Sequence, residues 1–275
     1  MNNIKYIIFP DIHGRSFWID VIEKYIGDEN IVFIFLGDYI DSYEYEHLSK
    51  NEWKNFLDIV ELKKKYPERI ILLLGNHDIH YLTHYGRGSR WDYKNSKRNE
   101  LFYKDNLNLF DMTFSTSINN INFLFSHAGV GRGWLEHNKK FFNMSISNDD
   151  IIKYEDLPNF NEYIHTNDEE LLENFYKTLS NVSFYRYGSH QYGSMIWADV
   201  HEHKKEYNNI SNVVQIFGHT QQEKDPINYN NKIYCLDCRK AFALCDDGIV
   251  YDLDDFTPVK TTTIKDNLDE YNFFI

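Results

Sequence analysis

The stretch IVFIFLGDYID, residues 31–41, decides the fold. Its first six residues, from Ile31 to Leu36, are all apolar and mostly β-branched or aromatic, and they show no alternation with polar residues. A short continuous apolar run of this kind is typical of a strand that is covered on both faces of a sheet. The run ends at Gly37-Asp38, and Asp41 follows three residues later. The stretch therefore predicts a buried strand whose carboxyl end carries acidic side chains.

Five further segments place Asp, Asn or His beside a glycine or another small residue, most of them directly after an apolar run. They are Asp11-Ile12-His13-Gly14, Gly75-Asn76-His77-Asp78, Ser126-His127-Ala128-Gly129, Trp197-Ala198-Asp199 and Gly218-His219-Thr220. Each segment alone fits an ordinary turn or helix cap. Because the same pattern recurs six times between residues 11 and 220, we interpret the segments together as one polar site.

The remaining pattern predicts alternating strands and helices. We expect strands over residues 4–10, 31–37, 70–75, 112–117, 121–126, 213–218, 232–237, 241–245 and 249–253, with a hairpin turn at Asp246-Asp247-Gly248. Helical patterns cover residues 16–26, 49–66 and 99–110. Strand–helix alternation favours right-handed crossover units. The chain therefore predicts a mixed α/β sandwich.

Residues 131–193 differ from the rest of the chain. They are polar and rich in Asn, Tyr and Glu, with one clear helical pattern at 168–179 for which Thr166 or Asn167 is the expected cap. We expect an insertion over the active face within one domain of residues 1–275. The tail, residues 257–275, is expected to be a peripheral extension.

Composition excludes several classes of protein. Hydrophobic residues make up 42% of the chain, so disorder of the whole chain is excluded. The net charge of −13 argues against non-specific nucleic-acid binding and against attachment to anionic membranes. Dications bound at a site would still permit a phosphate substrate. We expect no secretory leader or membrane span, and the three cysteines are expected to be buried, reduced thiols, which indicates a cytoplasmic protein.

The polar residues of the six segments form a mixed set of nitrogen and oxygen ligands. Open α/β sheets place their sites at the carboxyl ends of the strands, which is where these residues stand. Asp11 and His13 lie two residues apart, so both side chains can reach one crevice. Carboxylate, amide and imidazole without thiolate suit manganese, iron or zinc better than copper or a structural zinc.

The series DIHG, GDYID, GNHD, SHAG and GHT resembles the calcineurin-like metallophosphoesterase superfamily. It is most similar to the phosphoprotein-phosphatase branch, which includes bacterial and phage serine/threonine phosphatases and the diadenosine-tetraphosphatase relatives. The resemblance covers residues 11–220 and implies a four-layer α/β/β/α sandwich of two mixed β-sheets flanked by helices. Gln221 follows His219 where some nuclease and phosphodiesterase branches have a second histidine, and this difference favours the phosphatase branch.

The resemblance implies two divalent metal ions, with manganese expected first and iron or zinc as alternatives. The implied ligands are Asp11 and His13 for one metal, Asp38 as the bridge, and Asn76, His127 and His219 for the other metal. His77 resembles the general acid and Asp41 its carboxylate partner. Histidine is the side chain most easily protonated and deprotonated near neutral pH, and a carboxylate on its other nitrogen orients the ring. The implied reaction is in-line attack on phosphorus by a hydroxide that bridges the metals.

One expected residue is missing. The second motif of the family reads GDxxDRG, whereas this chain has Ser42 in place of the arginine that grips the substrate phosphate. A serine cannot replace the planar charged fork of arginine. The candidates to replace it are Arg15, Arg87, Arg90, Arg132 and Arg186.

Three functions therefore stay open. The first is a phosphatase acting on a phosphomonoester, including phosphoserine or phosphothreonine in a protein. The second is a hydrolase of dinucleoside polyphosphates or cyclic nucleotides, for which the aromatic flank could stack on a base. That flank consists of Tyr81, Tyr85, Trp91 and Tyr93. The third is a binding module without catalysis, although such a module has no chemical need for both His77 and Asp41.

Overall fold

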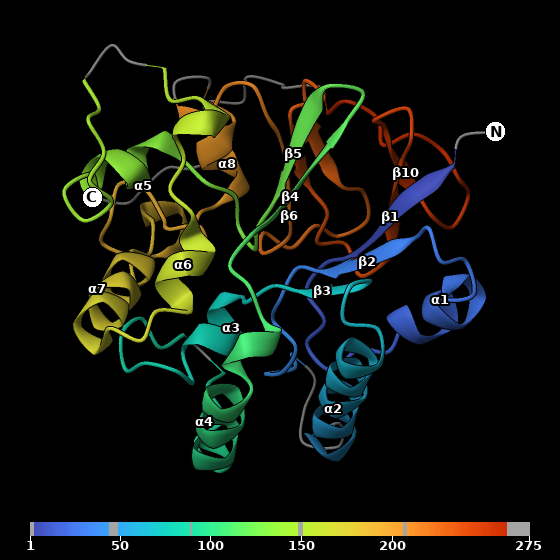
Figure 1. Cartoon of the computed structure of the whole chain (residues 1–275), viewed down its shortest axis with the longest axis horizontal. Coiled ribbons are helices and arrows are strands. Elements are labelled where there is room, and N and C mark those ends of the chain that lie inside the picture. Colours follow the sequence, from blue (N-terminus) through green and yellow to red (C-terminus); the bar gives the residue numbers. More distant parts are fainter. Residues whose placement is uncertain (1–2, 44–48, 89, 148–150, 206–207, 263–275) are drawn as a thin grey trace.

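The computed structural model describes residues 3–43, 49–88, 90–147, 151–205 and 208–262. Two five-stranded sheets form its centre (Figure 1). The first sheet holds, in spatial order, β10 (Val250–Asp252), β9 (Phe242–Cys245), β1 (Ile4–Phe9), β2 (Val32–Phe35) and β3 (Ile70–Leu72). β1, β2 and β3 run parallel to one another, and β9 pairs antiparallel with both β1 and β10. The parallel strands place the loops that follow them at one edge of the sheet.

The second sheet is also mixed. Its strands are, in spatial order, β4 (Phe114–Ile118), β5 (Ile121–Phe125), β6 (Val214–Phe217), β8 (Ile233–Cys235) and β7 (Ile227–Tyr229). β5, β6 and β8 run parallel, whereas β4 and β7 are antiparallel to their neighbours. β7 is the one strand here that the sequence pattern did not predict, because its three residues are too few to show a period.

The apolar runs are covered on both faces, as their lack of alternation predicts. In β1, Ile7 and Phe9 point into the core beneath the helices, and Ile8 points into the core between the two sheets. Phe9 stands opposite Phe35 of β2 in the parallel register, with ring centroids 4.6 Å apart. Because successive side chains in a strand face opposite ways, each run contributes to two cores.

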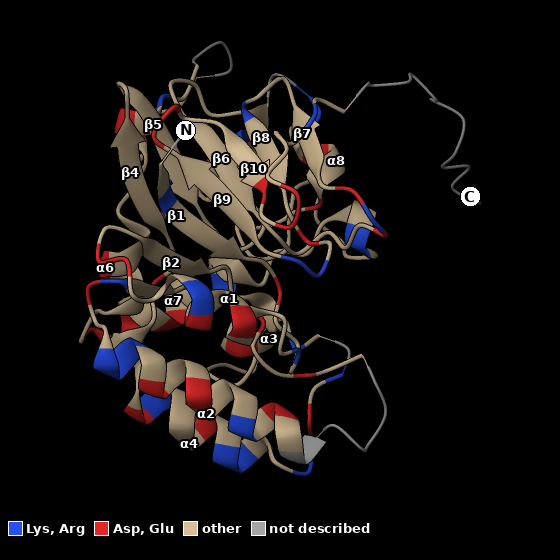
Figure 2. Cartoon of the chain, turned by 90° about the vertical axis from the view of Figure 1, so that its right-hand side faces the viewer, with Lys and Arg blue, Asp and Glu red and all other residues tan. Residues whose placement is uncertain are grey.

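Helices cover the outer face of the first sheet. They are α1 (Trp18–Tyr25), α2 (Ser49–Lys65) and α4 (Ser96–Asp105), and Figure 2 shows them on one side of the strands with charged residues along α2 and α4. Trp18 and Phe56 join the core that contains Phe9. On the second sheet, Val200 of the short helix α8 (Val200–His203) packs with Phe217 and Ile233. Two mixed sheets flanked by helices confirm the predicted four-layer arrangement.

Residues 131–147 and 151–193 fold as short helices that pack on one another. They comprise α5 (Arg132–His137), the 3-10 turn Tyr154–Asp156, α6 (Phe160–Ile164), α7 (Glu169–Leu179) and the 3-10 turn Phe184–Arg186. Trp134, Phe160 and Phe175 are buried in the same core as the first sheet. The indole nitrogen of Trp134 donates to the Thr178 carbonyl at 3.0 Å. This segment is therefore packed onto the body of the molecule.

Two local predictions need correction. The helix expected at 168–179 is present as α7, but its cap is Asp168, whose carboxylate accepts from Leu171 N at 3.0 Å. Thr166 instead accepts a hydrogen bond from Asp168 N and holds the turn before the helix. The helix expected over residues 99–110 is α4, which starts and ends earlier, and a 3-10 turn at Leu107–Leu109 follows it. A short helix, α3 (Asn76–Ile79), starts directly at the GNHD motif.

The three cysteines are buried and form no disulfide with one another, as expected. Burial raises the pKa of Cys238 and of Cys245 to about 12. None of the helices in the described part of the chain combines the length and the apolar composition needed to cross a bilayer. The predicted peripheral extension lies outside the described residues beyond Thr262, and before that point Val259 is buried against the core between the sheets.

Candidate metal centre

Four of the predicted ligands meet where strands of the two sheets end. Asp11 follows β1, Asp38 follows β2, His127 follows β5 and His219 follows β6. One ligand atom from each of these four residues lies within 4.8 Å of the others, and all four side chains are buried. Because β1 and β2 run parallel, as do β5 and β6, the polar residues after them gather at one end of the sandwich.

A second cluster shares a carboxylate with the first. It contains His13, Asp38 and His77, again within 4.8 Å. His13 Nε2 lies 3.4 Å from Asp38 Oδ2, and His127 Nε2 lies 3.5 Å from the same oxygen. Asp38 therefore stands between two groups of ligand atoms, as a carboxylate shared by two cations must.

The histidine tautomers fit metal binding. His13 Nδ1 lies 2.9 Å from the Ile40 carbonyl and His127 Nδ1 lies 2.8 Å from the Leu36 carbonyl. A carbonyl only accepts hydrogen bonds, so each Nδ1 carries the proton and each Nε2 keeps a free lone pair. Metal-binding histidines are commonly oriented by such a hydrogen bond on the other ring nitrogen.

Asn76 and His219 complete the group around His127. Asn76 Oδ1 lies 3.0 Å from His127 Nε2, and His219 Nδ1 lies 3.1 Å from the same nitrogen. Three potential ligand atoms thus converge, and among the described residues no cysteine sulfur joins the group. The donor set fits a borderline divalent cation such as manganese, iron or zinc.

The electrostatics of the site also fit cations. Burial and the neighbouring carboxylate of Asp11 raise the pKa of Asp38 well above its ordinary value. Burial lowers the pKa of His127, and burial together with Arg186 lowers the pKa of His219. Buried carboxylates that repel one another beside neutral imidazoles form a site that positive charge would stabilise.

The backbone at the site is strained and tightly packed. His13, Asp38, Asp41 and His219 all have positive φ, between 44° and 65°. Non-glycine residues rarely adopt this conformation, and it is concentrated at functional sites. A Cβ on Gly75 would lie 2.1 Å from Asp38 Oδ1. Only glycine fits there, because the Asp38 side chain crosses directly over the backbone.

His77 and Asp41 lie together beside the second cluster. His77 Nδ1 lies 2.9 Å from Asp41 Oδ2, so the other ring nitrogen faces the cluster side. The sequence pattern did not single out His80, whose Nε2 lies 2.7 Å from that same carboxylate oxygen. Tyr81 donates to Asp41 Oδ1 at 2.5 Å. Burial alone would raise the pKa of Asp41, but His77 and His80 bring it below its ordinary value.

Asp78, quoted in the GNHD motif without a role, ties the site loops together. Its Oδ2 accepts from Asp38 N at 2.7 Å and Gly75 N at 2.8 Å. Its Oδ1 accepts from Tyr39 N at 3.2 Å and Tyr103 Oη at 2.5 Å. The loops after β2 and β3 are therefore joined through one buried carboxylate.

Two of the candidate arginines contact the site histidines. Arg90 Nη2 lies 3.0 Å from His77 Nε2, and the Arg90 guanidinium stacks 3.5 Å from the centroid of the Tyr43 ring. Arg186, from the segment 131–193, places Nε 3.2 Å and Nη2 3.0 Å from His219 Nε2. Asp199 of the Trp197-Ala198-Asp199 segment lies 3.7 Å from Arg186 Nη1 and helps to orient it.

The other three candidates lie differently. Arg15 Nη1 donates to the Asp11 carbonyl at 3.3 Å, at the edge of the site. Arg87 lies over the Trp91 ring at 4.4 Å, and Arg132 pairs with Glu136 at 2.7 Å. The aromatic flank is also divided: Tyr81 is buried and bound to Asp41, whereas Tyr93 is 80% exposed.

Comparison with known proteins supports the interpretation of the two clusters as a metal centre. A model of the calcineurin-like phosphoesterase family matches residues 4–223. The serine/threonine-protein phosphatase 4 catalytic subunit of Eremothecium gossypii is 34% identical over 109 residues, which cover 34% of this chain and 33% of that protein. The phosphatase 6 catalytic subunit of Drosophila melanogaster is 30% identical over 95 residues, covering 30% and 29%. The matches span about a third of the length of these relatives.

Solved structures show the same fold at low identity. The cold-active protein-tyrosine phosphatase of a psychrophilic Shewanella superposes with a TM-score of 0.54 at 16% identity, covering 94% of this chain and 81% of that one. The similarity to serine/threonine phosphatases confirms the predicted phosphoprotein-phosphatase-like branch. Since the family model matches most of its length, the chain belongs to the calcineurin-like phosphoesterase family.

Proposed function

We propose that this protein is a dinuclear-metal-dependent phosphatase that hydrolyses phosphomonoesters, with phosphoserine or phosphothreonine in proteins as the first substrate class. The observation that carries the proposal is the pair of buried clusters joined through Asp38. The relatives named as serine/threonine phosphatases support the choice of substrate.

In this proposal Asp11, His13 and Asp38 hold one cation, and Asp38, Asn76, His127 and His219 hold the other. Manganese is the first expectation at both positions, with iron or zinc as alternatives, because a ligand set of carboxylate, amide and imidazole without thiolate suits these metals. Bound as a pair, such cations supply Lewis acidity and a water activated at neutral pH. The protein holds the ligand atoms in fixed positions. The hydrogen bonds from Nδ1 of His13 and of His127 to backbone carbonyls do this for two of the imidazoles.

Arg90 and Arg186 bind the substrate phosphate in place of the arginine missing at Ser42. Arg90 lies beside His77, and Arg186 lies beside His219. A guanidinium fork can donate two parallel hydrogen bonds to phosphate oxygens. Arg15 contributes charge at the edge, whereas Arg87 and Arg132 serve other contacts.

His77 donates a proton to the leaving oxygen of the ester. Asp41 holds the Nδ1 proton, so Nε2 is the nitrogen that faces the substrate. Burial, together with the charge of Arg90 and against the opposing effect of Asp41, lowers the pKa of His77 to about 4. A phosphate dianion that draws Arg90 toward itself would favour the protonated imidazole, because an opposite charge stabilises the charged form.

We also propose that residues 131–193 form a cap over the active face of a single domain, and that the protein works in the cytoplasm. The support for the cap is Arg186, which this segment contributes beside His219. The support for a reducing compartment is the three buried, unpaired thiols. The expected partner is a phosphorylated protein, with a small phosphorylated molecule as the alternative.

Purified protein with added Mn²⁺ should hydrolyse p-nitrophenyl phosphate and should lose the activity in excess chelator. Asp38→Asn should reduce turnover by at least about a thousandfold, because it removes the shared carboxylate. Asp58→Asn, on the exposed face of α2, is the matched control and should leave turnover unchanged. Full activity in a metal-free Asp38→Asn protein would overturn the proposal.

A substrate panel separates the proposed substrate from the alternatives. A phosphoserine peptide should be turned over faster than diadenosine tetraphosphate or a 2′,3′-cyclic nucleotide. Faster turnover of either nucleotide than of the peptide would favour the alternative function, hydrolysis of nucleotide substrates. Absence of turnover on every substrate, with metal bound, would assign the non-catalytic binding module.

A further inference from the structure

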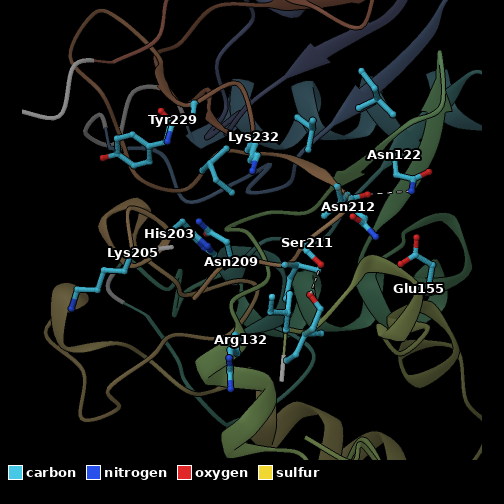
Figure 3. Close-up of a pocket in the computed structure, with 18 of the residues that line it drawn as sticks. Asn122, Arg132, Glu155, His203, Lys205, Asn209, Ser211, Asn212, Tyr229 and Lys232 are labelled. Carbon is cyan, nitrogen blue, oxygen red and sulfur yellow. Dashed lines mark hydrogen bonds between the residues drawn. The ribbon is translucent and has the colours of Figure 1, made fainter. Parts of the chain in front are cut away.

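A second cavity lies at the other end of the second sheet, away from the candidate metal centre. It has a volume of about 1280 Å³ and is lined by the amino ends of three parallel strands, at Ile121 of β5, Val214 of β6 and Ile233 of β8 (Figure 3). His127 and His219 follow the carboxyl ends of β5 and β6. The length of these strands therefore separates their amino ends from the metal centre by about 15–20 Å at the usual rise per residue, whereas His203 of the cavity lies against Ala128, next to His127.

The wall of this cavity is positively charged, although the chain carries a net charge of −13. Among the described residues, Lys204, Lys205 and Lys232 line it, together with one carboxylate, that of Glu155. None of the three lysines forms an ion pair with a described residue. Arg132 also lines the cavity and is already paired with Glu136. Three lysines around one concave surface would attract an anion, and lysine is a common phosphate ligand.

The floor holds two buried hydrogen-bonding atoms without a partner in the described part of the chain, His203 Nδ1 and Asn209 Oδ1. His203 is fully buried, and its Nε2 lies 3.2 Å from the Ala128 carbonyl. Because the carbonyl only accepts, Nε2 carries the proton. Burial lowers the pKa of His203 to about 4, so the ring is neutral near pH 7 and Nδ1 is an acceptor.

Both unpartnered atoms are therefore acceptors, and both need a donor from outside. A buried acceptor without a partner destabilises the folded state, so such atoms are rare unless a ligand or water binds them. The His203 ring is held in place by Ala128 and by Phe217, whose ring centroid lies 5.1 Å away. Its Nδ1 is thus fixed in direction, as a preorganised ligand contact is.

Part of the wall is apolar. Ile152, Ile210 and Val213 line the cavity, and Tyr229 contributes an aromatic ring. A ligand that fits all three features has an anionic group for the lysines, hydroxyl or amino donors for His203 and Asn209, and a flat or apolar part. Pockets for small organic molecules usually combine an apolar wall with a few placed polar groups in this way.

We propose that this cavity binds a small organic phosphate of the nucleoside-monophosphate class, independently of the metal centre. The phosphate contacts Lys204, Lys205 and Lys232, and hydroxyl or amino groups of the ligand donate to His203 and Asn209. This site is separate from the substrate site of the proposed phosphatase.

The test uses the full chain in excess chelator, because adenosine 5′-monophosphate is itself a phosphomonoester that the proposed Mn²⁺-loaded enzyme would bind and hydrolyse. Isothermal titration calorimetry with this nucleotide as the probe measures the binding. Saturable binding is expected, with adenosine and inorganic phosphate each at least about tenfold weaker, because each offers only part of the contacts. The double variant Lys204→Glu and Lys232→Glu should weaken binding of the probe by more than about tenfold. Lys24→Glu, an exposed lysine on α1, is the matched control and should bind as the wild type does.

Asp38→Asn separates this site from the metal centre and should keep the affinity for the probe. Asn209→Ala should reduce the preference for adenosine 5′-monophosphate over inorganic phosphate, because it removes an acceptor that phosphate does not use. Loss of binding in Asp38→Asn with no effect of the lysine variants would place the probe at the metal centre and overturn the proposal. Absence of saturable binding, or equal affinity for adenosine, would overturn it as well.

Discussion

Arg90 Nη2 lies 3.0 Å from His77 Nε2, the ring nitrogen that Asp41 leaves free. The same guanidinium donates to the Asp41 carbonyl through Nη1 and stacks on Tyr43. An arginine from the loop after α3 thus reaches the place beside the proposed acid, close to Ser42, where the family motif has its arginine. Arg90, from the loop after α3, thus places a positive charge where Ser42, in the loop after β2, has none.

We predict that Arg90→Ala raises KM for p-nitrophenyl phosphate by about tenfold or more and also lowers kcat. The variant removes a charge-assisted fork of hydrogen bonds to the phosphate, and such bonds contribute about 1.5–3 kcal/mol each. Steady-state kinetics measure both constants. Arg87→Ala, whose guanidinium lies over Trp91, should change neither, and equal effects of the two variants would contradict the assignment.

His77→Asn should lower kcat by about 10²–10⁴-fold, the usual contribution of a positioned general acid. Metal content, measured by inductively coupled plasma mass spectrometry, should stay at the wild-type level because His77 is not a proposed ligand. His84→Asn is the control, since His84 is exposed on the chain surface. A parallel loss of metal and activity in His77→Asn would instead make His77 a ligand.

Asp78→Asn should destabilise the fold by about 2–4 kcal/mol, because the amide offers one acceptor where the carboxylate accepts four hydrogen bonds. Urea denaturation followed by circular dichroism measures the free energy of unfolding. Asp58→Asn on exposed α2 should change it by less than about 0.5 kcal/mol. A neutral Asp78→Asn would show that these loops hold their shape without the carboxylate.

Asp38 should destabilise the folded protein when metal is removed and should stabilise it when metal is bound. In chelator, Asp38→Asn should melt at or above the wild-type temperature, because burial and Asp11 make the ionised Asp38 unfavourable. Mn²⁺ at about 100 times its Kd should stabilise the wild type by about 2.7 kcal/mol and the variant by much less. Thermal unfolding with and without Mn²⁺ tests both statements, and an identical shift in the two proteins would remove Asp38 from the metal site.

Glu52 should make stability depend on pH. It accepts a hydrogen bond from Ser42 N at 2.7 Å, and burial raises the pKa of Glu52 from 4.5 to about 7. The folded state therefore binds the proton more tightly than the unfolded state, and this stabilisation is complete below pH 4.5 and is lost as the pH rises through about 7. Glu52→Gln should thus gain stability relative to the wild type over that range.

The check for Glu52 is the difference in unfolding free energy between wild type and variant, measured at several pH values from about 4 to 8. Glu61→Gln, which removes an exposed partner of Lys64 on the same helix, should give a flat difference. A flat difference for Glu52→Gln as well would mean that the carboxyl is ionised throughout.

The sequence determined most strands and the order of the candidate ligands by itself. Apolar runs such as residues 31–37 leave no alternative to burial on both faces, so β2 and its acidic end follow directly. The parallel connection of β1 and β2 then brings Asp11 and Asp38 to one edge. The sequence pattern missed β7, which has only three residues. It also predicted the wrong cap for α7, because the capping residues Thr166 and Asn167 stand just before Asp168, the actual cap.

Only the tertiary structure decided which side chains lie beside these candidates. Arg87 and Arg90 stand three residues apart in one loop, yet one packs on Trp91 and the other on His77. Both are arginines that follow the same motif, so the sequence does not distinguish them. The fold does, because Arg90 also packs over Tyr43. His80 gave no signal either, because its contact with Asp41 joins positions 39 residues apart. Contacts of this kind depend on how the loops pack, which local pattern does not encode.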